Sequence, residues 1–99
     1  MTHQIKTWPG EFEAVRTGRK CHEVRRNDRG YCVGDFLILK EWNPATEQYT
    51  GRAVLRRVTY LTPSCAWGLP KGICVMSLGG DTTVRKGDAP AARTSNVQL

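Results

Sequence analysis

FLILKEW, residues 36–42, is the segment that decides the fold, because it is the clearest strand of the chain. Its side chains alternate between two faces, with Leu37 and Leu39 on the side opposite Phe36. The tight turn Val33-Gly34-Asp35 leads into it, and Asn43-Pro44 ends it. We interpret Asp35 as a turn former whose carboxylate bonds nearby backbone. The pattern therefore predicts a strand bounded by turns on both sides.

The neighbouring segments supply one helix and further strands. Pro9 suits the first turn of a helix, since its missing N–H would be unpaired there anyway, and Gly18 suits its end. We therefore predict a helix over residues 9–17 and a loop over 63–72. A run of thirteen residues exceeds the usual strand length, so the long segment 49–61 is expected to be bent or bulged. Strands are expected over residues 3–7, 20–26, 36–42, 49–61 and 73–78.

These elements predict a small, strongly curved α+β sheet in residues 1–78. Short strands of this kind commonly close partly into a barrel, which removes exposed edges. Residues 79–99 hold few apolar side chains and cannot offset the entropy of ordering. We therefore expect one domain over 1–78 and a disordered C-terminal tail over 79–99.

Length and hydropathy exclude some classes of protein. The chain has 99 residues, which is the size of one domain, and 39% of them are hydrophobic. It contains no run of about 20 apolar residues that could cross a membrane. Residues 1–15 also lack the apolar core of a secretory signal. We expect a cytoplasmic monomer with no membrane partner.

The positive charge is concentrated in one segment. The formal net charge is +6 and the pI is about 9.5. Residues 16–29 hold six basic side chains against Glu23 and Asp28. Such a segment on a basic domain is typical of a protein that binds polyanions, although many small proteins are basic for solubility alone.

The cysteines and histidines do not form a metal motif. No CxxC pair occurs, and His3 and His22 are far apart in the sequence, so zinc-ligand spacing is absent. We expect no metal and no cofactor. We also expect the cysteines to be small apolar core residues. They stand at positions 21, 32, 65 and 74.

The basic segment contains a possible recognition cluster. Lys20 and Arg25 bracket Glu23, and a carboxylate flanked by cations is expected to stay ionised and to accept a hydrogen bond from an amino group of cytosine or guanine. Arg25 and Arg29 offer planar forks for phosphate or a base edge. Trp8 could stack on a base. In the simpler interpretation, Glu23 and Arg25 form a structural ion pair and Trp8 anchors the helix.

The order of these motifs resembles a known family. The runs are HxIKTWP at 3–9, GRKxxEVRRNDR at 18–29 and VGD at 33–35. Over about residues 3–78 they are similar to small bacterial and phage proteins, a domain of unknown function in the ASCH group of the PUA-like superfamily. The resemblance implies a pseudo-barrel of five to six strands with one main helix. It also implies a cleft beside that helix for RNA, a nucleotide or a modified nucleoside. By resemblance, the ligand-binding residues would be Lys6, Trp8, Lys20, Glu23, Arg25, Asp28 and Arg29.

Two functions from different classes follow. The first is an RNA- or nucleotide-binding module without turnover. The second is an amidohydrolase that acts on an acylated nucleoside such as acetylated cytidine, as some small ASCH proteins do with a lysine, a threonine three residues later and a downstream glutamate. Lys20 matches the lysine, but Glu23 stands at the threonine position and no acid occurs from Gln48 to Gly80. Lys20 and Glu23 would be catalytic only in this second case, and we favour binding. A third possibility is an accessory protein that meets a host protein through its basic face.

Overall fold

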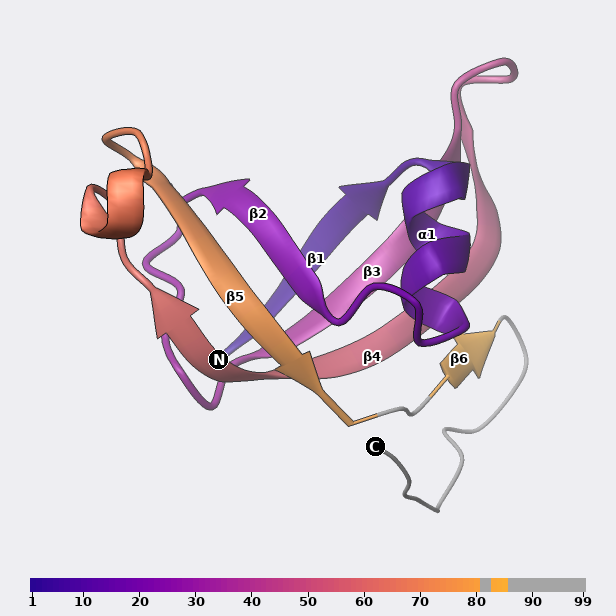
Figure 1. The fold of residues 1–99 in the computed structure, drawn as a ribbon. Coiled ribbons are helices and arrows are strands. Elements are labelled where there is room, and N and C mark those ends of the chain that lie inside the picture. Colours follow the sequence, from indigo (N-terminus) through magenta and orange to yellow (C-terminus); the bar gives the residue numbers. More distant parts are fainter. Residues whose placement is uncertain (81–82, 86–99) are drawn as a thin grey trace.

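The computed structural model describes residues 1–80 and 83–85, in which a curled mixed sheet carries one short helix on its inner side (Figure 1). The elements along the chain are β1 (Thr2–Thr7), α1 (Pro9–Arg16), β2 (His22–Arg26), β3 (Phe36–Asn43), β4 (Gln48–Thr62), the 3₁₀ turn η1 (Ala66–Gly68), β5 (Ile73–Gly79) and β6 (Thr83–Arg85). The α+β class and the positions of the helix and of the five long strands confirm the sequence prediction.

The sheet has the strand order β1-β3-β4-β5-β2, and β6 adds to β4. β1 runs parallel to β3, whereas the other neighbours are antiparallel. The predicted strand at 36–42 lies next to β1 and β4. Its Leu39 is opposite Ile5 of β1 and Val54 of β4, and all three side chains are buried. β3 thus supplies the middle of the core.

β4 bends, as its length predicted. Its pairing with β3 shifts register between Lys40 and Trp42, and its pairing with β5 shifts between Val58 and Tyr60. Bulges of this kind bend a strand and increase its twist. The first part of β4 pairs with β3 and the last part with β5, so the bent strand carries the sheet round and turns its two end strands, β1 and β2, toward each other.

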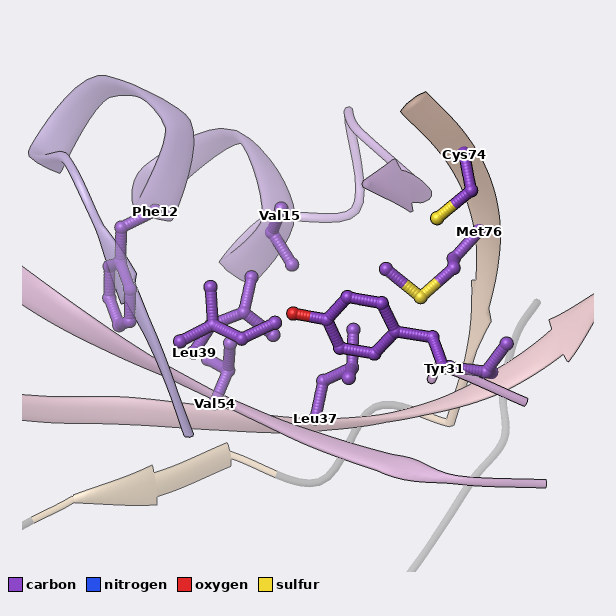
Figure 2. Packing of buried hydrophobic residues seen from close by; sticks show 10 residues of the cluster. Phe12, Val15, Tyr31, Leu37, Leu39, Val54, Cys74 and Met76 are labelled. Atoms are coloured by element: carbon purple, nitrogen blue, oxygen red, sulfur yellow. The ribbon is translucent and has the colours of Figure 1, made fainter. Parts of the chain in front are cut away.

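The core fills the inside of this curl. Phe12 and Val15 of α1 are three positions apart and share a face, as expected, and each is only 1% exposed. Figure 2 shows both side chains pointing from the helix toward the sheet, with the Tyr31 ring reaching into the same cluster. The eight-residue α1 is too short to cross a membrane, and no other helix of the described residues could do so.

Two expectations need correction or restriction. Cys74 is buried in the core, but the other three cysteines are exposed, so the prediction of core cysteines was wrong for them. Each lies outside the regular strands that line the core. Of the expected C-terminal tail, Gly79 belongs to β5 and Thr83–Arg85 pairs with β4. The rest of that prediction, 81–82 and 86–99, lies outside the described residues.

Candidate functional site

The burial pattern of β2 is the reverse of that in an ordinary half-buried strand, because Glu23 and Arg25 face the core and its valine faces solvent. Its only aliphatic residue, Val24, is 51% exposed, whereas Glu23 is 5% exposed. The register explains this, because Glu23 is opposite Met76 and Arg25 is opposite Cys74, both of which are core residues. Residues directly opposite each other share a face of the sheet. The sheet therefore directs a carboxylate and a guanidinium into the inside of the curl and leaves a valine outside.

The two inward side chains form a partly satisfied ion pair. Arg25 Nε donates to Glu23 Oε2 at 2.8 Å, and the Glu23 side chain is 7% exposed against 31% for Arg25. The other carboxylate oxygen, Glu23 Oε1, is fully buried and has no hydrogen-bond partner among the described residues. A buried polar oxygen without a donor is costly and uncommon. Oε1 is thus an acceptor that the described part of the chain leaves unused.

Two arginines connect the end strands of the sheet. β1 and β2 stand at opposite ends of the strand order, and they do not pair through their backbones. Instead, Arg25 Nη2 donates to the carbonyl oxygen of Lys6 at 2.8 Å, and Arg29 Nη1 donates to that of Gln4 at 2.7 Å. The opening between the two strands is therefore spanned by side chains, which can rotate away more easily than a ladder of backbone bonds can break.

The loop after β2 fixes the position of Arg29. Asn27 accepts a hydrogen bond from the Tyr31 amide at 3.0 Å, and its own amide donates to Gly72. Tyr31 is buried, and burial raises the pKa of its hydroxyl, although the nearby charges of Arg29 and Arg25 oppose that rise. Asp28 is exposed on the same loop. The buried ring of Tyr31 therefore anchors the loop beside the two arginines.

The structure separates the other predicted residues from Glu23. The Lys20 ammonium pairs with Glu11 of α1 and holds the pKa of that carboxyl below its usual range. The Lys6 side chain lies on the outer face of the sheet, so only the Lys6 backbone reaches Arg25. Trp8 is 56% exposed at the start of α1. Of the residues predicted to line a cleft, the structure brings together Glu23, Arg25, Arg29 and the Lys6 backbone.

Sequence reasoning missed a second buried carboxylate contact. Asp35 Oδ2 accepts from the Cys32 amide at 3.0 Å, as a turn former would, but it also lies 2.8 Å from His3 Nε2. The His3 contact, together with the Cys32 amide, lowers the pKa of the Asp35 carboxyl against the opposing effect of burial. The His3 ring also packs edge-on against Tyr31, with ring centroids 4.7 Å apart. The alternation of β1, with His3 and Ile5 on one face, was the signal that could have found it.

A curled mixed sheet with one short helix and a buried carboxylate–arginine pair defines a small α+β domain. Residues 2–78 match the family described as Domain of unknown function (DUF3850), and the chain belongs to this family. It is also similar to the "Uncharacterized 12.9 kDa protein in GpA 3'region" of Escherichia phage P2, with 40% identity over 65 residues. That match covers 66% of this chain and 58% of the phage protein, so the chain spans less than two thirds of its relative. The prediction of a small family of unknown function with phage members is confirmed.

Proposed function

We propose that this protein is a PUA-like module that binds single-stranded RNA or a nucleotide, with Glu23 as the residue that recognises the base. The observation that carries the proposal is the buried Glu23 Oε1, which has no donor among the described residues. Oε2 is held by Arg25, so the carboxylate is oriented before any ligand arrives. A preoriented acceptor inside a basic domain suits a ligand that brings an N–H donor together with negative charge.

The chemistry of Oε1 selects among bases. A carboxylate oxygen accepts a hydrogen bond from the exocyclic amino group of cytosine, adenine or guanine. Uracil has no amino group, and its N3–H lies between two carbonyl oxygens that a carboxylate repels. A hydrogen bond to a charged group contributes about 1.5–3 kcal/mol, which corresponds to about tenfold or more in affinity. We therefore expect cytosine to be preferred over uracil, its closest analogue in shape.

A ligand reaches Oε1 through movement of Arg25. Oε1 is buried, whereas the Arg25 side chain, which spans from Glu23 to the Lys6 carbonyl, is 31% exposed and can shift toward solvent. Arg25 Nε keeps its hydrogen bond to Glu23, while its Nη2, once it leaves the Lys6 carbonyl, is available to bind a phosphate, as is Arg29. The binding of phosphate thus compensates for the hydrogen bond to Lys6 that Arg25 gives up.

The rest of the molecule supports an anionic ligand with bases. The net charge of +6 favours association with phosphates. Trp8 is more exposed than buried, which leaves its ring available for stacking. Lys20 remains in the proposed set as a source of positive charge, although Glu11 partly neutralises it. Asp28 is exposed on the same loop as Arg29 and remains in the proposed set.

Hydrolysis of an acylated nucleoside has less support. It would require Lys20 and Glu23 to act as a pair on the same carbonyl group. The Lys20 ammonium instead contacts Glu11, and Glu23 contacts Arg25. A nucleophile and its base need to lie within hydrogen-bond reach of each other. The binding module is therefore the function that this geometry favours.

The test compares two short single-stranded RNAs, oligocytidylate and oligouridylate, on the wild type and on Glu23→Gln. We expect the wild type to bind oligocytidylate about tenfold more tightly, because the cytosine amino group donates to Oε1, whereas the carboxylate repels the two carbonyl oxygens that flank the uracil N3–H. Glu23→Gln should remove most of that preference. Glu47→Gln, the same change at an exposed position in the turn before β4, serves as the matched control and should behave like the wild type.

The outcomes separate the two functions. Equal binding of both RNAs by the wild type, or an unchanged preference in Glu23→Gln, would show that Glu23 does not read the base. Absence of binding at low salt would remove the binding module altogether. Release of acetate from acetylated cytidine, lost in Lys20→Ala, would support the hydrolase instead.

A further inference from the structure

The outer face of β1, β3 and β4 carries a compact group of cations and rings, which we call the lysine–aromatic patch. Its members are Lys6, Lys40, Trp42 and Tyr49. Lys6 Nζ lies 4.0 Å from the centroid of the Trp42 ring, and Lys40 Nζ lies 4.6 Å from that of Tyr49. The two rings contact each other edge to face, with centroids 5.0 Å apart. The patch is on the side of the sheet opposite the core.

The two lysines stand where a sheet ordinarily avoids a pair of like charges. Lys6 and Lys40 are directly opposite each other in the register of β1 and β3. Like charges at such positions repel and destabilise the pairing. Within residues 1–80 neither ammonium forms an ion pair, and the only side-chain hydrogen bond of Lys40 Nζ is to the neutral Gln4 side chain, at 3.3 Å. The rings hold both cations in place without neutralising them.

Two lysines at opposite positions of neighbouring strands offer ammonium donors to one anion. A phosphate placed between Lys6 and Lys40 would relieve their repulsion and accept hydrogen bonds from both. Tyr49 is 46% exposed, so its ring can also stack on a base next to that phosphate. An acidic protein would satisfy the lysines, but it would make no use of an exposed ring beside them. The patch therefore fits a nucleic acid better than an acidic peptide.

Lys6 joins this patch to the Glu23 site. Its ammonium belongs to the outer patch, whereas its carbonyl oxygen accepts from Arg25, which in turn binds Glu23. We infer that the ligand is a polynucleotide strand rather than a free nucleotide. The strand crosses the open edge of β1, with one base at Glu23 and a neighbouring phosphate on Lys6 and Lys40. This inference rests on the proposed function and specifies its ligand class.

The experiment measures the binding of cytidine monophosphate and of an octanucleotide of oligocytidylate to the wild type and to Lys40→Gln. The octanucleotide should bind about three- to tenfold more weakly to Lys40→Gln at low salt, and the slope of log K against log salt should become shallower by about 0.7. Affinity for cytidine monophosphate should stay within twofold. Lys71→Gln, at an exposed lysine before β5, is the matched control and should change neither. Lys40→Arg keeps the charge and should restore octanucleotide binding, which excludes misfolding as the cause.

Each result bears on this inference. If the octanucleotide binds with a cytosine preference that depends on Glu23, but Lys40→Gln and Lys71→Gln behave alike, the polynucleotide path is wrong and the base site stands. If the octanucleotide binds no better than the monophosphate, the ligand is a nucleotide. If polyglutamate displaces the octanucleotide at equal charge, the patch binds acidic chains in general. If neither nucleic acid probe binds, both proposals fail together.

Discussion

Glu23 and Asp35 are buried to nearly the same extent, 5% and 7% exposed, but the fold satisfies them differently. Asp35 accepts from the Cys32 amide, contacts His3, and lies 3.3 Å from the Met1 amino group, so both of its oxygens have partners. Among the described residues, Glu23 has one side-chain partner, Arg25, and one oxygen without a donor. A satisfied buried carboxylate fixes a structure, whereas an unsatisfied one lowers stability until a donor arrives. The comparison assigns Asp35 to the scaffold and supports Glu23 as the recognition residue.

The largest expected effect comes from removing the satisfied carboxylate. Asp35→Ala leaves the buried His3 ring and the Cys32 amide without their acceptor, and we expect the free energy of unfolding to fall by about 3 kcal/mol. Urea unfolding measures the change. Asp28→Ala, at an exposed carboxylate, is the control and should shift stability by no more than about 0.5 kcal/mol. If Asp35→Ala loses no more stability than Asp28→Ala, Asp35 does not stabilise the scaffold.

Local sequence signals predicted the turn role of Asp35, but they predicted neither its contact with His3 nor the inward direction of Glu23. Asp35 follows Gly34, and its role in a tight turn was predicted from those neighbours. On β2, alternation correctly grouped Glu23 with Arg25, but it could not say which face is inside. Val24 alone would favour the opposite choice. The register with Met76 and Cys74, which lie about fifty residues further along the chain, determines which face of β2 is inside. The local sequence pattern contains no information about this register.

The placement of the lysines also depended on distant parts of the chain. The strand at 36–42 and the helix from Pro9 were predictable, because their signals lie within a few residues. Whether the Lys6 side chain meets Glu23 depends on how far the sheet curls and on which side of β1 faces inward. His3, Ile5 and Thr7 take the inner face of β1, so the ammonium of Lys6 points away from the core. Only its carbonyl oxygen remains at the open edge.

A smaller change in the free energy of unfolding is expected from the Glu23–Arg25 pair than from the contacts of Asp35. Arg25→Met removes the one partner of a buried carboxylate and should cost about 1–2 kcal/mol, less than a fully buried pair would, because Arg25 is 31% exposed. Adding Glu23→Leu removes the unpaired oxygen as well. The double variant should recover wild-type stability or exceed it, since apolar replacement of such pairs is often neutral or stabilising.

The same double variant separates stability from binding. It should no longer distinguish oligocytidylate from oligouridylate, although it folds at least as well as the wild type. Thermal unfolding and RNA titration on one preparation provide both measurements. If the double variant is less stable than Arg25→Met alone, Glu23 contributes to the scaffold as Asp35 does, and the distinction between the two carboxylates disappears.

The smallest effect concerns the pH dependence of stability, which tests the Asp35 contacts directly. The pKa of Asp35 is lowered from 3.8 in the folded state, mainly by the hydrogen bond with His3. The contribution of Asp35 to stability is therefore fully present above pH 3.8 and is lost as the pH falls through the lower folded-state pKa.

His3→Phe keeps a ring against Tyr31 but removes the hydrogen-bond partner of Asp35, so stability should fall less steeply with decreasing pH. We expect the pH-dependent loss of stability to be smaller in His3→Phe than in the wild type, measured by urea unfolding between about pH 5 and 2. Glu13, whose pKa is lowered to about 2 by Arg16 and Arg52, should add the same dependence to both proteins and cancel in the comparison. Parallel curves for the two proteins would mean that His3 contributes nothing to the stability of the Asp35 carboxylate, which would then depend on the Cys32 amide and the Met1 amino group.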